Sequence, residues 1–229
     1  MELGGEFVVR IYICEDMSEK NIGNEKFSAV FAKKCIFDFL DIDTAKYSVA
    51  FRYNTYGKPF IKDIYNSADG SKFDITPQFS ISHSENIIVC AVAYFNIGLD
   101  CQKKSISDAD KCRKIAKRFY ADGENEFLDA LESDAYIDNF FEIWAKKEAY
   151  IKYTGKGIAE GMKDFSVADC ESGQKNYLSD KNIDVIFKRI DIKNEKDFVV
   201  YLCYNKGDNE EINNKNQPEI LLRGINFYV

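Results

Sequence analysis

The sequence contains little that could build a zinc site or a disulfide framework. Its 229 residues include one histidine, and its seven cysteines are scattered, with no pair in the C-x-x-C spacing. A Cys/His zinc site would therefore lack ligands. An odd number of dispersed thiols, in a chain that starts without the basic residues of a secretion signal, predicts a reduced protein in the cytoplasm.

Long apolar runs, prolines and excess positive charge are also missing. No stretch of 18 apolar residues occurs, so we expect no membrane span. Three prolines and no low-complexity tract argue against a long flexible linker. The 31 Lys and Arg residues are outnumbered by 38 Asp and Glu, which gives a net charge of -7. Nucleic acid and anionic membranes are therefore not expected partners, and any anionic partner needs a local basic patch.

The remaining composition is that of a globular protein, with 45% hydrophobic and 14% aromatic residues. Apolar periodicity predicts strands and helices in the order strand, helix, strand, strand, strand, strand, helix, helix, strand, strand and a final strand near the C-terminus. This order predicts an α+β fold of two similar halves, residues 1–98 and 99–229. The predicted elements are residues 7–13, 25–40, 49–53, 79–82, 87–95, 98–102, 108–120, 139–153, 183–192 and 198–204.

Two short patterns place polar groups together. Asp100 and Gln102 are two apart in a predicted strand, so their side chains point to the same side. Trp144, Glu148 and Lys152 recur every four residues of a predicted helix and therefore form one stripe. If the strand faces the helix, the oxygen ligands suit Mg²⁺ and the lysine suits a diphosphate substrate.

Each piece also has a simpler interpretation. Glu148 and Lys152 at this spacing are commonly a surface ion pair worth a few tenths of a kcal/mol. Trp144 is more often a core residue than a cofactor platform. His83 lies in a predicted turn, where a histidine commonly serves as a cap or a hydrogen-bonding group. The Gly57-Lys58-Pro59 sequence is by default a turn.

The combination and order of several motifs favour the functional interpretation. The motifs are Gly57-Lys58-Pro59, Ile81-Ser82-His83-Ser84, Gly98-Leu99-Asp100-Cys101-Gln102, Arg118-Phe119-Tyr120-x-x-x-Glu124, Trp144-x-x-Lys147-Glu148-Ala149-x-x-Lys152 and Gly155-Lys156-Gly157. Over residues 57–157 this order resembles the 4′-phosphopantetheinyl transferases, in particular their longer, Sfp-type members. The W-x-x-K-E-A-x-x-K element together with I-S-H-S is the most specific part of the resemblance.

The resemblance implies a pseudo-twofold fold of two α+β halves with coenzyme A bound in the cleft between them and Mg²⁺ on its diphosphate. By the family's pattern, the metal ligands are Asp100, Gln102 and Glu148, and Lys152 contacts the diphosphate. From its position near the metal, Glu148 is predicted to accept the serine proton, so Glu148 and Lys152 are the predicted catalytic residues. The implied coenzyme A contacts are Lys58, Ser82, His83, Lys152 and, by a looser match, Lys26. The implied product is a carrier protein bearing phosphopantetheine, with release of adenosine 3′,5′-bisphosphate.

The sequence departs from the family at one metal position. The second acidic residue of the family's G-x-D-x-E element is Gln102 here. A neutral amide oxygen removes one negative charge from the site, so we expect Mg²⁺ to bind more weakly or with an additional water.

A partner surface is also predicted. Lys111, Lys114 and Arg118 follow helical spacing and form a basic patch on an otherwise acidic chain. Such a patch suits the acidic helix of an acyl or peptidyl carrier protein. The alternative is an ordinary solvated helix face. We expect the protein to be a monomer.

Two other functions remain open at this stage. Asp100, Glu124 and Glu148 with Lys152 would also suit a metal-dependent phosphodiesterase or nuclease, although the charge balance is unfavourable. A non-catalytic module that binds carrier protein or acyl-coenzyme A is the other alternative, and the presence of both metal carboxylates argues against it. A Ser-His hydrolase is excluded because the chain has no G-x-S-x-G element.

Overall fold

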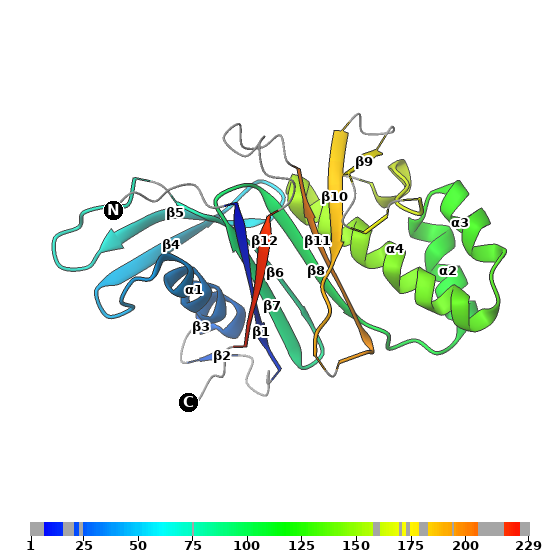
Figure 1. The fold of residues 1–229 in the computed structure, drawn as a ribbon, viewed down its shortest axis with the longest axis horizontal. Helices are drawn as coiled ribbons and strands as arrows, with labels where there is room; N and C mark the ends of the chain where they lie inside the picture. Colours follow the sequence, from blue (N-terminus) through cyan, green and yellow to red (C-terminus); the bar gives the residue numbers. More distant parts are fainter. Residues whose placement is uncertain are drawn as a thin grey trace. The chain divides into compact units, whose positions relative to one another are not determined.

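The computed structural model of the chain consists of two compact units (Figure 1). The first is formed by residues 1–97 with residues 206–229, and the second by residues 98–205. The described residues are 7–15, 21–22, 25–74, 76–157, 161–169, 171–172, 175–178, 183–193, 195–205 and 218–224. The mixture of helices and sheets confirms the predicted α+β class.

The first unit is organised around a four-stranded sheet of order β12-β1-β7-β6. Its strands are β1 (Val8–Cys14), β6 (Gln78–Ser84), β7 (Ile87–Ala93) and β12 (Glu219–Gly224). β1 and β12 are parallel, whereas the β1–β7 and β6–β7 pairs are antiparallel. Helix α1 (Phe27–Leu40) packs on β7 and β6 and buries Phe27, Phe31 and Cys35 (Figure 1).

Two hairpins complete the first unit. β4 (Tyr47–Tyr53) pairs with β5 (Pro59–Asn66), and the short strand β2 (Asn21–Ile22) pairs with β3 (Glu25–Lys26). β12 lies in this first unit, whereas the sequence-based prediction assigned all of residues 99–229 to the second half. Its parallel pairing with β1 joins segments more than 200 residues apart, a contact for which local sequence carries no signal.

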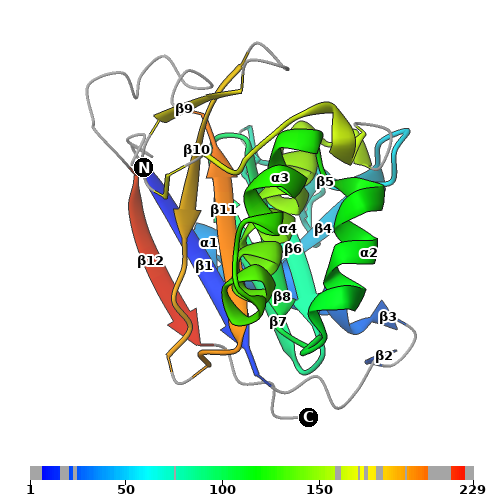
Figure 2. The same ribbon diagram turned by 90° about the vertical axis from the view of Figure 1, so that its right-hand side faces the viewer.

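In the described part of the second unit, a four-stranded sheet of order β8-β11-β10-β9 is combined with three α-helices. The strands are β8 (Ile97–Lys103), β9 (Lys175–Leu178), β10 (Ile183–Arg189) and β11 (Phe198–Tyr204). The helices are α2 (Ala109–Phe119), α3 (Asp122–Asp129) and α4 (Ser133–Thr154). α4 packs on β11, and α2 and α3 pack on α4 (Figure 2). A short 3₁₀ turn, η2 (Met162–Asp164), follows α4.

Helix α4 differs from its predicted limits at one end. The predicted C-terminal stop is confirmed, because Gly155 caps the helix with φ of 69°. The predicted N-cap at Asn139 is wrong, because the helix begins six residues earlier, at Ser133. Asn139 lies inside it and donates from Nδ2 to the carbonyl of Ala135 at 2.8 Å. Tyr136 and Phe140 continue the apolar face through this first part of the helix and are buried.

No described helix combines the length and the apolar composition needed to cross a membrane.

Candidate active site

The polar residues of β8 face α4. Leu99 and Cys101 are buried on one side of the strand, and the intervening Asp100 is buried on the other. Its Oδ1 accepts a hydrogen bond from Lys152 Nζ at 2.7 Å, and its Oδ2 accepts one from Gln102 Nε2 at 2.9 Å. Both carboxylate oxygens of Asp100 therefore accept hydrogen bonds from neighbouring side chains.

Glu148 lies one helical turn before Lys152 and belongs to the same cluster. Burial raises the pKa of the Glu148 carboxyl, the nearby Asp100 carboxylate raises it further, and the Lys152 ammonium opposes both effects. Two carboxylates and one ammonium therefore share a small, largely buried volume. A carboxyl with a raised pKa accepts a proton more readily once it is ionised.

Trp144 is the third member of the predicted stripe and is half-buried. Its indole packs edge-on against the ring of Phe119, with 5.7 Å between centroids, and also contacts Phe140 and Tyr120. These aromatic contacts join α2 to α4. The simpler interpretation of Trp144 as a core residue therefore describes its packing.

The residues present fit a divalent cation. Asp100 and Glu148 supply hard oxygen ligands, and a cation beside them would relieve their mutual repulsion. Among the described residues no group of three or more His, Cys, Asp and Glu side chains could hold a metal ion. The protein would therefore provide two carboxylates, and the remaining ligands would have to come from an amide oxygen, water or the substrate.

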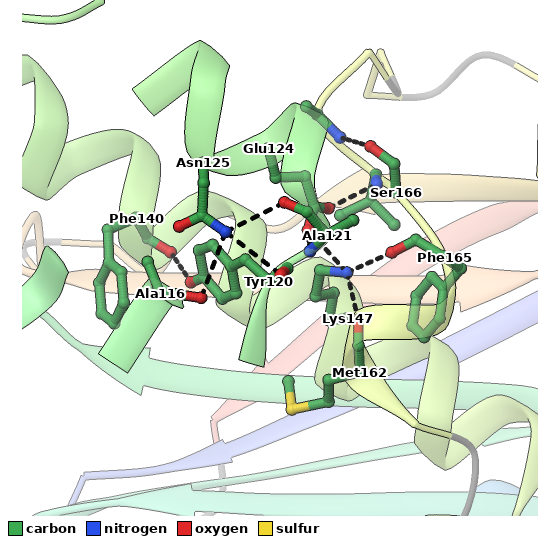
Figure 3. A network of polar contacts seen from close by, with 12 residues as sticks. Ala116, Tyr120, Ala121, Glu124, Asn125, Phe140, Lys147, Met162, Phe165 and Ser166 are labelled. Carbon is green, nitrogen blue, oxygen red and sulfur yellow. Dashed lines mark hydrogen bonds and ion pairs between the residues drawn. The ribbon is translucent and has the colours of Figure 1, made fainter. Parts of the chain in front are cut away.

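Lys147 is the residue before Glu148, but its side chain enters a separate, fully buried network (Figure 3). Its Nζ lies 2.8 Å from Glu124 Oε2 and donates to the carbonyls of Met162 and Phe165. Glu124 also accepts from the backbone nitrogen of Val167 at 2.8 Å. The pair thus joins α3, α4 and the segment that contains η2.

This network removes Glu124 from the candidate metal site. Glu124 has no solvent exposure and is committed to Lys147, so it cannot join Asp100 and Glu148 as the nuclease alternative requires. The Lys147–Glu124 pair was not predicted from the sequence. A signal was present, because Lys147 follows Phe140, Ile143 and Trp144 along an apolar part of α4, where a lysine needs a buried partner.

The other predicted coenzyme A contacts belong to the first unit. Lys58 is half-buried at the β4–β5 turn, where Nζ donates to the carbonyl of Ile97 at 3.5 Å, and Lys26 is exposed just before α1. Ser82 is buried on β6, and the adjacent His83 is exposed. The predicted turn position of His83 is wrong, because His83 pairs with Ile88 within the β6–β7 ladder.

The predicted basic patch lies on α2. Lys111, Lys114 and Arg118 are exposed, while Cys112 and Ala116 on the opposite side of the helix are buried. The neighbouring Arg113 is half-buried and is engaged with two aspartates and with the ring of Tyr136. Three basic side chains are thus presented together on the solvent side of α2.

The sequence model of the 4′-phosphopantetheinyl transferase superfamily matches residues 96–203. This region contains Asp100, Gln102, Glu148 and Lys152, but not Lys58 or His83.

Several similar curated proteins are named 4′-phosphopantetheinyl transferases. The transferase Sfp of Bacillus subtilis (strain 168) is 32% identical over 166 residues, 72% of this chain and 64% of that protein. The transferase gsp of Aneurinibacillus migulanus is 38% identical over 134 residues, 58% of this chain and 50% of that protein. HetI of Nostoc sp. (strain PCC 7120 / SAG 25.82 / UTEX 2576), also a 4′-phosphopantetheinyl transferase, is 38% identical over 122 residues, 52% of this chain and 47% of that protein. The chain therefore matches less than two thirds of the length of each of these relatives. The predicted resemblance to the 4′-phosphopantetheinyl transferases is confirmed by these matches.

Proposed function

From the match of residues 96–203 to the 4′-phosphopantetheinyl transferase superfamily, we propose that the chain transfers the 4′-phosphopantetheine group of coenzyme A to a serine of an acyl or peptidyl carrier protein. The observation that supports this proposal most directly is the contact of Asp100 with Lys152 beside Glu148. These residues are the ones that the family motifs assign to metal and diphosphate.

Mg²⁺ is the proposed cofactor. Asp100 and Glu148 would hold it, together with the amide oxygen of Gln102. When bound, it would neutralise charge on the diphosphate of coenzyme A.

The proposed reaction is a displacement at phosphorus. The serine oxygen of the carrier protein forms a bond to the phosphorus that carries the pantetheine arm, and the bond from that phosphorus to the oxygen of the leaving group breaks. Adenosine 3′,5′-bisphosphate leaves with the electron pair of the broken bond. The Glu148 carboxylate takes the serine proton, directly or through a water, and its raised pKa suits it to this role. The Lys152 ammonium offsets the charge that develops on the phosphoryl oxygens.

Binding of the rest of coenzyme A is assigned to residues of the first unit. Lys58 and His83 are proposed to contact its phosphates, with Ser82 and Lys26 as further contacts. Lys58 and Lys26 carry the charge that phosphate oxygens require. His83 would donate a further hydrogen bond from its ring.

The carrier protein is proposed to dock in part on Lys111, Lys114 and Arg118. Their exposure on one side of α2 gives the acidic chain a local cationic surface. Such a surface attracts an acidic partner helix and orients its approach. A cytoplasmic location and a monomeric state remain predictions.

The direct test is to incubate the protein with coenzyme A, Mg²⁺ and a panel of apo carrier proteins and to measure intact masses. We expect the mass of phosphopantetheine on at least one carrier, and no addition to the same carrier with its acceptor serine replaced by alanine. Glu148→Gln and a reaction with EDTA serve as controls for the site and the metal. If the carriers bind but are not modified in the complete reaction, the function is that of a non-catalytic binding module.

A further inference from the structure

We propose that Gly98 is a positioning residue whose missing side chain sets the separation between β8 and α4, and thereby the contact of Asp100 with Lys152 next to Glu148. The inference concerns the geometry of the proposed active site, and its activity readouts rest on the proposed function. Its stability readout does not.

The backbones of β8 and α4 touch at Gly98. A Cβ added to Gly98 would lie 1.9 Å from the carbonyl oxygen of Ala149, 2.3 Å from the nitrogen of Tyr153 and 2.9 Å from its Cα. Ordinary contacts between carbon atoms are about 3.5–4.0 Å. All three neighbours are backbone atoms, so no change of side-chain rotamer could make room. Any larger residue at this position must move the strand away from the helix.

The polar cluster lies directly beside this contact. Asp100 is two residues after Gly98 on the same side of β8, and Glu148 immediately precedes Ala149. Lys152 immediately precedes Tyr153, and its Nζ reaches Asp100 Oδ1 at 2.7 Å. The two backbone contacts thus adjoin the two α4 residues of the cluster. A displacement at Gly98 is therefore passed to Asp100, Glu148 and Lys152 together.

The opposite side of β8 is packed in the interior. Leu99 and Cys101 have no exposed surface and anchor β8 in the interior, while Ala149 is equally buried in α4. The strand and the helix are therefore each held by their own packing. The size of the residue at position 98 determines how closely they approach.

The first test measures the coupling between Asp100 and Lys152 in unfolding free energy, using Asp100→Asn, Lys152→Met and the double variant in urea. The cycle is repeated in a Gly98→Ala background and in a Gly123→Ala background. Gly123 is the matched control, because it lies in α3 of the same unit and a Cβ there would have no atom within 4 Å. We expect the coupling to persist with Gly123→Ala and to be lost with Gly98→Ala. Equal coupling in both backgrounds would overturn the proposal.

The second test uses transfer kinetics and a longer carboxylate. Gly98→Ala should lower kcat on the order of 100-fold, as misplacement of reacting groups by about 1 Å can, and should leave KM for the carrier protein unchanged. Adding Asp100→Glu should restore part of kcat in this background, because the extra methylene spans the wider gap. In the wild-type background the same change should lower kcat. An Asp100→Glu change that lowers kcat equally in both backgrounds would contradict the positioning role.

If the Gly98→Ala protein does not fold, the proposal can still be tested in the wild-type background. There the narrow spacing leaves no room for a longer side chain, so the Asp100→Glu variant should lose its stability coupling to Lys152 as Asp100→Asn does. Retained coupling would overturn the proposal. If coupling behaves as expected but no protein transfers phosphopantetheine, the positioning role of Gly98 stands and the proposed function fails.

Discussion

Lys147 Nζ lies 2.8 Å from Glu124 Oε2, and neither side chain is exposed to solvent. The three donors of the ammonium are used by Glu124, the Met162 carbonyl and the Phe165 carbonyl. Buried charges are costly unless their partners are complete, as they are here. The pair therefore holds α3 and the segment after α4 against the helix that carries Glu148.

Breaking this pair on one side should strongly destabilise the protein. We expect Lys147→Ala to lower the unfolding free energy by about 3–5 kcal/mol, because it leaves the Glu124 carboxylate buried without its cation. The matched control is Lys72→Ala, since Lys72 Nζ also lies 2.8 Å from a carboxylate, that of Asp63, but is 60% exposed. Its loss should cost at most about 1 kcal/mol.

Urea unfolding of both variants measures the difference. The double variant Lys147→Met with Glu124→Gln should recover part of the lost stability, because no unpaired charge remains. Similar costs for Lys147→Ala and Lys72→Ala would show that the Lys147 ammonium is not confined as described.

Replacing Glu148 should have opposite effects on stability and activity. Burial and the Asp100 carboxylate raise the pKa of Glu148 in the folded protein. A raised carboxyl pKa means that the folded state binds this proton more tightly than the unfolded state does. Its stabilising contribution is therefore complete below the ordinary carboxyl pKa and is lost as the pH rises through the raised value.

At neutral pH, Glu148→Gln should thus be more stable than the wild type, and each 1 kcal/mol of relief would raise the melting temperature by about 2–4 °C. The difference should shrink as the pH falls through the raised pKa of Glu148, and it should be gone below the ordinary carboxyl pKa. Turnover should fall on the order of 100-fold or more, because a proposed metal ligand and base is lost. Melting curves across pH and the carrier mass assay measure the two effects. A Glu148→Gln protein that is less stable than the wild type at neutral pH would contradict this account of the site.

The spacing of apolar residues correctly predicted those strands and helices whose apolar side chains face a single core. The 98–102 strand and the pair of strands within residues 183–204 have alternating or continuous apolar residues, and the structure contains them as β8, β10 and β11. The pattern failed for α3, whose sequence DGENEFLD contains a glycine and four acidic residues. That helix is stabilised by Glu124, which accepts from the backbone nitrogen of Ala121 and pairs with Lys147. Tertiary contacts of this kind are not visible in local sequence.

The motifs identified the polar cluster but not what holds it in place. Strand alternation and helical spacing bring Asp100, Glu148 and Lys152 onto facing sides of β8 and α4. The distance between those sides depends on the backbone contact at Gly98. Such a contact depends on how two elements cross, and spacing within either element cannot reveal it.

Charge reversal on α2 should weaken carrier recognition and leave coenzyme A binding intact. Replacing Lys111, Lys114 and Arg118 with glutamate should raise KM for the carrier protein at least about tenfold, the equivalent of 1.4 kcal/mol, and reduce its dependence on salt. The control reverses Lys193 and Lys196, two exposed lysines between β10 and β11 of the same unit. Kinetics at several salt concentrations and calorimetry with coenzyme A separate the two effects. An equal loss of coenzyme A affinity would place this patch in the substrate site instead of the docking surface.

A negative charge at position 102 should change both the stability of the protein and its affinity for Mg²⁺. Gln102 Nε2 donates a hydrogen bond to Asp100 Oδ2 at 2.9 Å. Because the amide is neutral, Gln102 adds no charge to the site. Gln102→Glu should replace this hydrogen bond with repulsion between carboxylates. The protein without Mg²⁺ should then melt at a lower temperature than the wild type.

The same added charge should strengthen metal binding. At 4 Å the attraction between unit charges near a protein surface is about 4 kcal/mol before desolvation. If about 1.4 kcal/mol of this attraction remains, the Mg²⁺ concentration for half-maximal turnover falls about tenfold. Asp100→Asn should raise that concentration.

Gln102→Ala is the control, because it removes the hydrogen bond without adding charge, and it should not lower the Mg²⁺ requirement. Titration of Mg²⁺ against turnover in the four proteins measures these differences. Identical midpoints for the wild type and Gln102→Glu would show that position 102 does not face the metal, and the metal ligands would then have to be sought without it.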